Sequence, residues 1–96
     1  MMKLSAEERA AALKDLPAWR YDQERQAIVR QFQFADFQEA FAFMTRIALA
    51  AEKADHHPEW SNVWNKVDVA LTTHSAGGLT VKDLDLAAIM DKAASA

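Results

Sequence analysis

The stretch that decides the fold is residues 36–53, DFQEAFAFMTRIALAAEK. Asp36 and Glu39 have the spacing of a helix-capping signal. The apolar side chains that follow recur every three or four positions, as they do on one face of a helix. These side chains are Phe37, Ala40, Phe41, Met44, Ile47, Ala48 and Ala51. The stretch therefore predicts a helix over 37–53, about 25 Å long at 1.5 Å per residue, whose apolar face packs on a sheet.

Two strands are predicted downstream of this helix. Pro58 favours an extended conformation for the residue before it, so the helix must end before His57. Residues 60–64 are rich in types that favour strands, and apolar side chains alternate with other residues over 67–71. Such alternation is typical of a strand with one buried face. Asn65-Lys66 is interpreted as the turn between two strands, although one bent strand is the alternative.

The residues upstream predict a helix followed by a hairpin. Ser5 and Glu8 have the form of a capping box, which predicts a helix over 6–15. Residues 18–34 alternate in the manner of strands around a polar turn at 22–25. Arg30 is the charged exception on the apolar face of the second predicted strand.

The chain ends with a third predicted helix. Gly77-Gly78 breaks the strand pattern, and Thr80-x-x-Asp83 is a further capping signal before a helix over 81–94. The order of elements is α-β-β-α-β-β-α. Short turns between strands favour an α+β fold with a four-stranded antiparallel sheet and three helices on one face. A length of 96 residues suits a single domain, 1–96.

Composition narrows the classes of function. The net charge is −3 and the basic residues form no run, so direct binding of nucleic acid is not expected. The absence of cysteine excludes disulfides and thiolate metal sites. No apolar stretch approaches the roughly 20 residues that span a bilayer, and the first residues turn acidic where a signal peptide would be apolar. A soluble, cytoplasmic protein is expected.

The three histidines are the residues most suited to chemistry. His56 and His57 lie in the predicted loop after the long helix, and His74 lies at the end of the last strand. Three readings remain open from the residues alone. Surface histidines are often only polar side chains, three imidazoles with a carboxylate can bind zinc, and histidine transfers protons near neutral pH. The separation of His56 from His74 matches no compact metal motif, and His-Glu-x-x-His is absent.

A combined pattern resembles the pterin-4a-carbinolamine dehydratase family. Its members carry an acidic residue, a His-His-Pro triplet, an aromatic residue, a histidine and an aspartate in order. The matching positions here are Glu52, His56, His57, Pro58, Trp64, His74 and Asp83, and the similarity extends upstream through residues 4–8 and 41–46. Trp64 stands where tyrosine is common, which keeps an aromatic wall. The resemblance implies the fold above, a homodimer or homotetramer, a pterin substrate, and no metal or organic cofactor.

The resemblance also implies a reaction and a catalytic set. The substrate is a 4a-hydroxytetrahydropterin, which loses water to give a quinonoid dihydropterin. His56, His57 and His74 are the implied catalytic residues. We expect His56 and His74 to transfer protons at the 4a-hydroxyl and His57 to orient the substrate. Glu52, one helical turn before His56, is expected to hold His56.

Further residues are expected to contact the pterin, which gives a substrate-binding set of Glu52, Pro58, Thr73, Ser75, Ala76 and Asp83. Thr73, Ser75 and Ala76 are expected to bind the pterin edge through backbone groups. Asp83 has two readings, a helix cap and a catalytic residue. An aromatic amino acid hydroxylase is the implied source of substrate. Animal relatives also serve as dimerisation partners of a homeodomain transcription factor, so a non-catalytic dimerisation or regulatory protein is the alternative function.

Overall fold

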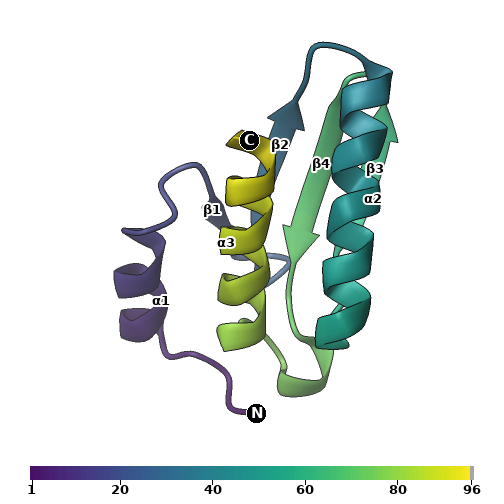
Figure 1. Ribbon diagram of the computed structural model, residues 1–96. Helices are drawn as coiled ribbons and strands as arrows, with labels where there is room; N and C mark the ends of the chain where they lie inside the picture. The colour runs from purple at the N-terminus through teal and green to yellow at the C-terminus, as the bar shows by residue number, and fades with distance from the viewer. Residues whose placement is uncertain (96) are drawn as a thin grey trace.

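A computed structural model describes residues 1–95 and has three α-helices on one face of a four-stranded sheet (Figure 1). The predicted order of elements is confirmed, with one short 3-10 helix in addition. No helix within these residues is long and apolar enough to cross a membrane. The elements are α1 (Ala6–Leu13), β1 (Arg20–Asp22), β2 (Ala27–Gln33), α2 (Phe37–Ala54), β3 (Glu59–Val63), β4 (Lys66–Leu71), η1 (His74–Ala76) and α3 (Val81–Ser95).

The strands lie in the order β1-β2-β4-β3, and every neighbouring pair is antiparallel. The β3–β4 turn falls one residue earlier than predicted, at Trp64-Asn65, because Val63 already pairs with Lys66. Trp64 has a positive φ of 50°. Asn65 is buried, and its Nδ2 donates to the carbonyl of Phe34 (2.8 Å), which holds the turn against the end of β2.

The face of α2 that packs on the sheet differs in part from the predicted stripe. Ala40, Ile47 and Ala51 are buried as predicted, and so is Phe43, whose ring lies 4.8 Å from that of Phe32. Phe37, Phe41 and Ala48 were placed on the buried face, and this was wrong, because all three are exposed. The helix carries apolar side chains on two adjacent faces, and the sheet covers only one of them.

Arg30 lies on the covered face of the sheet, where a charge needs a partner. Its guanidinium carbon sits 4.1 Å from the centre of the Phe32 ring, a cation–π distance. Its Nη1 lies 2.5 Å from Oδ1 of Asp91 on α3, and the same oxygen accepts from the indole N–H of Trp19 (2.8 Å). Asp91 thus joins α3 to β2 and to the segment before β1.

Replacing this shared acceptor should destabilise the fold. Asp91→Ala leaves two partly buried donors without an acceptor, so we expect a loss of about 1–3 kcal/mol in the free energy of unfolding. Lys92→Ala, at the exposed neighbouring position, is the matched control and should change little. Urea unfolding followed by fluorescence measures both. Equal stabilities for the two variants would show that Asp91 contributes nothing.

Candidate active site

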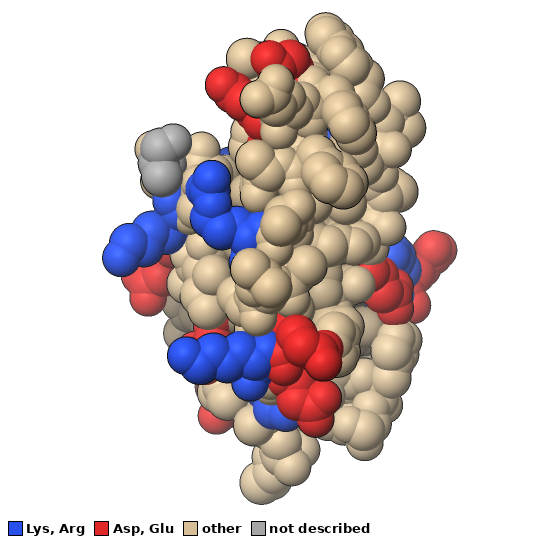
Figure 2. Space-filling model, turned by 45° about the vertical axis from the view of Figure 1, so that its right-hand side comes forward, with Lys and Arg blue, Asp and Glu red and all other residues tan. Residues whose placement is uncertain are grey.

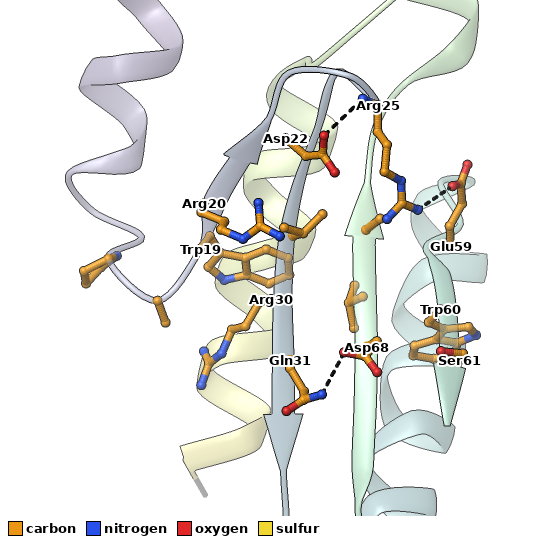
Figure 3. A pocket seen from close by; sticks show the side chains of 15 residues that line it. Trp19, Arg20, Asp22, Arg25, Arg30, Gln31, Glu59, Trp60, Ser61 and Asp68 are labelled. Carbon is orange, nitrogen blue, oxygen red and sulfur yellow. Dashed lines mark hydrogen bonds and ion pairs between the residues drawn. The ribbon is translucent and has the colours of Figure 1, made fainter. Parts of the chain in front are cut away.

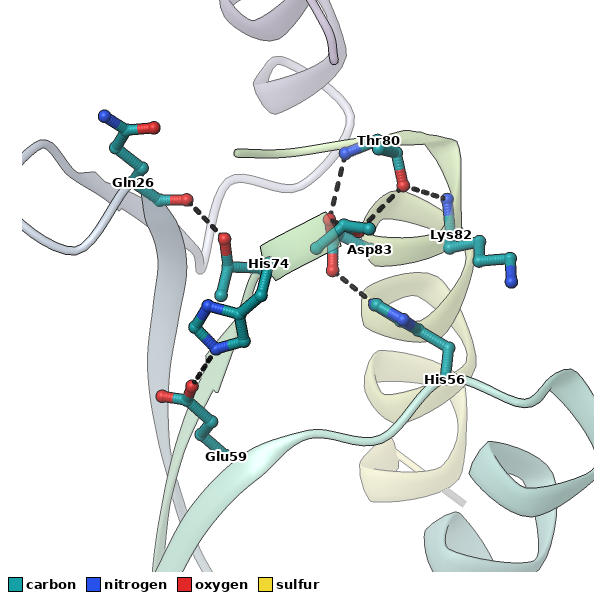
Figure 4. Close-up of polar contacts among 9 residues, drawn as sticks. Gln26, His56, Glu59, His74, Thr80, Lys82 and Asp83 are labelled. Atoms are coloured by element: carbon teal, nitrogen blue, oxygen red, sulfur yellow. Dashed lines mark hydrogen bonds and ion pairs between the residues drawn. The ribbon is translucent and has the colours of Figure 1, made fainter. Parts of the chain in front are cut away.

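The three histidines lie toward the end of the sheet where α2 and β4 finish and β3 and α3 begin, and Figure 4 shows His56 and His74 there. Two stretches of the chain, residues 52–59 and 73–83, therefore meet around them. Residues at the ends of rigid elements are well placed for function, because the scaffold fixes them without burying them fully.

The end of α2 fixes the backbone of His56. Asp55 adopts the left-handed conformation (φ 51°, ψ 44°), and its N–H donates to the last carbonyls of the helix. The N–H of His56 then donates to the carbonyl of Ala51 (3.0 Å), the six-residue closure of a Schellman motif. Pro58 follows and cannot continue a helix. Local sequence thus places His56 at a fixed point just beyond the helix.

The carboxylate of Asp83 is the centre of a buried network (Figure 4). Its side chain is 0% exposed. One oxygen, Oδ2, accepts from the N–H of Thr80 (2.9 Å) and from the hydroxyl of Thr73 (2.8 Å). The other, Oδ1, lies 2.5 Å from Nε2 of His56. Asp83 therefore caps the start of α3, as predicted, and also holds a candidate catalytic histidine.

Each of the other two histidines also faces a carboxylate. Nε2 of His57 lies 2.8 Å from Oε1 of Glu52, and Nε2 of His74 lies 2.7 Å from Oε1 of Glu59. The expectation that Glu52 holds His56 was wrong. The left-handed turn at Asp55 reverses the chain, so His56 points to α3 while the next side chain returns to α2.

All three pairs use the same ring nitrogen. An ionised carboxylate only accepts hydrogen bonds, so the Nε2 that faces it carries the proton. In the neutral ring, Nδ1 is then left as an acceptor, and within residues 1–95 no side-chain hydrogen bond engages it in any of the three. Carboxylate–imidazole pairs of this kind orient the ring and select its tautomer.

The three pairs differ in exposure. The side chain of His56 is 10% exposed, whereas those of His57 and His74 are 59% and 80% exposed. The hydrogen bond from His74, followed by that from Arg25, holds the pKa of Glu59 below its ordinary value, while slight burial opposes the shift. The site thus combines one rigid, buried imidazole with two that face solvent.

Hydrogen bonds within the loop after β4 limit which of the predicted residues can bind a pterin through a backbone N–H group. The N–H of Thr73 donates to the carbonyl of Gly78 (3.0 Å), and the N–H of Ala76 donates to the carbonyl of Thr73 (3.0 Å). These two N–H groups are therefore occupied inside the loop. Ser75 is exposed and is the remaining candidate of the three for contact through its N–H. Pro58 is half-buried beside the histidine pair.

The structure differs from the sequence-based expectation at one aromatic and one acidic position. Trp64 is 64% exposed and lies in the β3–β4 turn, at the opposite end of these strands from His74, so it is not an aromatic wall of this site. Glu59 is absent from the set of residues predicted from the sequence, although it pairs with His74. Because β3 and β4 are antiparallel and joined by a tight turn, the start of β3 lies beside the end of β4. Counting residues back from the predicted turn is the signal that could have placed Glu59 near His74.

A metal would need several of these groups to converge. Within residues 1–95, no three histidine, aspartate or glutamate side chains gather closely enough to hold an ion.

A hollow of about 600 Å³ lies away from the histidines, on the sheet face that the helices leave open (Figure 3). Arg25 and Glu59 are on its wall, whereas none of the histidines lines it.

Comparisons with known proteins agree with this geometry. The family described as pterin 4 alpha carbinolamine dehydratase matches residues 2–93. A Rhizorhabdus wittichii protein provisionally named a pterin-4-alpha-carbinolamine dehydratase is 66% identical over 84 residues, 88% of this chain and 87% of its own. A protein of the same provisional name from a Bradyrhizobium species is 58% identical over 94 residues, 98% of this chain and 94% of its own.

A solved structure matches in three dimensions as well. The crystal structure of a transcriptional coactivator/pterin dehydratase from Brucella melitensis has a TM-score of 0.93 and 48% sequence identity, and the match covers 96% of this chain and 98% of that one. These matches define the class of protein as a hydro-lyase. The chain belongs to the pterin-4a-carbinolamine dehydratase family.

Removing the buried carboxylate tests the network directly. Asp83→Ala leaves the Thr80 N–H, the Thr73 hydroxyl and His56 without their acceptor. Breaking a buried pair in this way typically costs about 3–5 kcal/mol, so we expect a large fall in the melting temperature. Asp85→Ala, two residues along α3 and exposed, is the control and should melt almost as the native chain does. A small effect at Asp83 would mean that the network does not hold these segments together.

Proposed function

We propose that this chain removes water from a 4a-hydroxytetrahydropterin through acid–base catalysis by His56, His57 and His74. The observation that carries the proposal is the repeated carboxylate–imidazole pair, present three times toward one end of the sheet. A structural role requires no such repetition, whereas a reaction that moves two protons benefits from several oriented imidazoles.

The reaction balances without an external oxidant or reductant. The bond between C4a and the hydroxyl oxygen breaks, and this oxygen takes a proton as it leaves as water. The proton on the neighbouring nitrogen N5 passes to a base, and a double bond forms between N5 and C4a. Hydroxide is a poor leaving group, so the reaction needs an acid on one side and a base on the other. Histidine serves either role near neutral pH.

We assign proton transfer at the 4a-hydroxyl to His56 and His74, and substrate orientation to His57. Asp83 fixes the ring of His56 from the buried side. His74 and His57 extend from the surface, where a bound pterin can reach them. The remaining proposed contacts are with Glu52, Pro58, Thr73, Ser75, Ala76 and Asp83, of which Asp83 acts through His56 in this scheme.

Three parts of the proposal do not depend on the geometry of the site. A cytoplasmic location rests on the composition of the sequence. The absence of a required metal or organic cofactor rests on the family resemblance and on the lack of a compact metal motif, and a place in tetrahydrobiopterin recycling rests on the resemblance. In that setting an aromatic amino acid hydroxylase supplies the carbinolamine. Another enzyme, a reductase, must then reduce the product, a quinonoid dihydropterin, if the pterin is to be used again.

Substitution of the histidines tests the catalytic assignment. General acid–base groups typically contribute about 10²–10⁴-fold to a rate. We expect His56→Ala and His74→Ala each to lower the dehydration rate by the low end of that range or less, because the substrate also loses water unaided. The double variant should be slower than either single one. His57→Ala should weaken pterin binding more than it slows the chemical step.

The same four variants separate catalysis from a structural role. Single-turnover rates are measured by stopped-flow absorbance in the presence of a chelator, with thermal melts and circular dichroism run in parallel. Near-normal turnover per folded double variant would overturn the catalytic assignment. Activity that a chelator abolishes and zinc restores would contradict the metal-free proposal.

A regulatory role is the second candidate function. The Brucella structure is named a transcriptional coactivator as well as a pterin dehydratase. Animal members of the family also form dimers with a homeodomain transcription factor. Measured turnover by the purified chain would favour the enzyme. A chain that binds a partner protein and shows no turnover would favour regulation.

We also propose that the chain assembles into a homodimer or homotetramer. The exposed face of α2 carries large apolar side chains, since Phe37, Phe41 and Leu49 are 47%, 55% and 70% exposed. Figure 2, which turns the α2 side of the molecule forward, has a broad area there with few charged groups. A second copy is the proposed occupant, because a two-fold interface pairs the same apolar patch of each chain with its counterpart.

Association should be measurable at micromolar concentration. We expect sedimentation to give a species of at least twice 10.7 kDa. Phe41→Asp should shift it toward the monomer, because association would bury a charge. Arg46→Asp, at an exposed position on a different side of the same helix, is the control and should leave the assembly intact. A native chain that sediments only as a monomer would contradict the proposal.

A further inference from the structure

We propose that Glu59 is a positioning residue for His74, and that Arg25 anchors Glu59 from across the open face of the sheet. Glu59 uses its two oxygens separately. Oε1 lies 2.7 Å from Nε2 of His74, and Oε2 lies 3.3 Å from Nη2 of Arg25 (Figures 3 and 4). The three side chains form one chain of contacts, defined here as the Arg25–Glu59–His74 relay.

The relay connects the turn between β1 and β2 to the edge strand β3. Arg25 belongs to the turn between β1 and β2, and its N–H donates to Oδ1 of Asp22 (3.3 Å). Glu59 begins β3, which is the edge strand on the other side in the order β1-β2-β4-β3. The side chain of Arg25 therefore reaches over β4 to meet Glu59, as Figure 3 shows. Ala70, the β4 residue paired with Glu59, is only 2% exposed.

His74 needs such a partner more than His56 does. It lies in the one-turn helix η1 and its side chain is 80% exposed, so packing does not restrain the ring. Its only side-chain hydrogen bond within residues 1–95 is to Glu59. A carboxylate at Nε2 holds the proton on that nitrogen and leaves Nδ1 to face the substrate. Glu59 thus does for the exposed histidine what Asp83 does for the buried one.

Arg25 gives Glu59 a defined orientation. A glutamate held at one oxygen still rotates about its side-chain bonds, whereas contacts at both oxygens restrict it. The pKa of Glu59 is held below its ordinary value by His74 first and Arg25 second, so the carboxylate stays ionised at neutral pH. An exposed ion pair contributes little to stability, which points to positioning and not to folding as the role of the relay.

The contact itself can be tested without substrate, on the full chain. Carbon-13 NMR of the glutamate carboxyls gives the pKa of Glu59 in each variant. We expect Arg25→Met to raise it toward the ordinary value, and His74→Ala to raise it further. Arg20→Met is the matched control, since Arg20 lies on the same hairpin and lines the same hollow without pairing with Glu59. An unchanged pKa in both test variants would overturn the relay.

Kinetics test the positioning role, which rests on the proposed dehydratase function. We expect Glu59→Ala to lower kcat about 10-fold, less than loss of a general acid–base group costs, with KM and the melting temperature little changed. Arg25→Met should have a smaller effect in the same direction, and Glu59→Gln should restore part of the rate because its amide oxygen still accepts from Nε2.

A double-variant cycle makes the test specific. If Glu59 acts through His74, adding Glu59→Ala to His74→Ala should cost nothing further, because interacting residues are not additive. An equal additional loss in that background would overturn the inference, as would a normal kcat for Glu59→Ala. A native chain with no turnover would instead refute the proposed function, while the NMR measurement would still decide whether the relay exists.

Discussion

The buried carboxylate of Asp83 is the constraint on which the active-site end of this molecule depends. A charge that is 0% exposed is costly unless hydrogen bonds satisfy it. Its donors come from three places: the start of α3, the loop after β4 and the loop after α2. These segments must therefore meet for the carboxylate to be buried at all. One side chain thereby caps a helix, closes the end of the sheet and orients His56.

A second feature of the fold is that each face of the sheet carries its own ion pair, and the two pairs differ in their surroundings. On the covered face, Asp91 of α3 neutralises Arg30 and also accepts from Trp19. On the open face, Glu59 meets Arg25 in an exposed pair that contributes little to stability. The first pair fastens a helix to the sheet. The second connects the sheet to a histidine, which is why we propose for it a role in positioning His74 and not in folding.

The graded exposure of the three histidines suits a reaction that needs both rigidity and access. His56 is held in the protein interior by a satisfied carboxylate, while His57 and His74 are held from the surface by Glu52 and Glu59. In the proposed reaction, a fixed imidazole would give a constant geometry for proton transfer, and exposed imidazoles would be accessible to the substrate. The family to which the chain belongs eliminates water from a pterin, and this arrangement offers acids and bases in three orientations.

The sequence by itself determined the order of the elements and the places where helices start, because capping and strand alternation are local properties. The pairs Ser5–Glu8, Asp36–Glu39 and Thr80–Asp83 mark the three starts, and a side-chain cap is present at each of them. The three histidines could also be predicted as the candidate site from the sequence, because they belong to one pattern of residue types in a defined order.

Tertiary structure alone decided which carboxylate each histidine meets and which face of α2 is buried. His56 pairs with Asp83, 27 positions away, and not with the nearby Glu52. Periodicity could not separate Phe43, which is buried, from Phe41, which is exposed, because α2 is apolar on two adjacent faces. Partner choice depends on which element ends lie side by side, and that follows from strand order and helix packing, which no local pattern encodes.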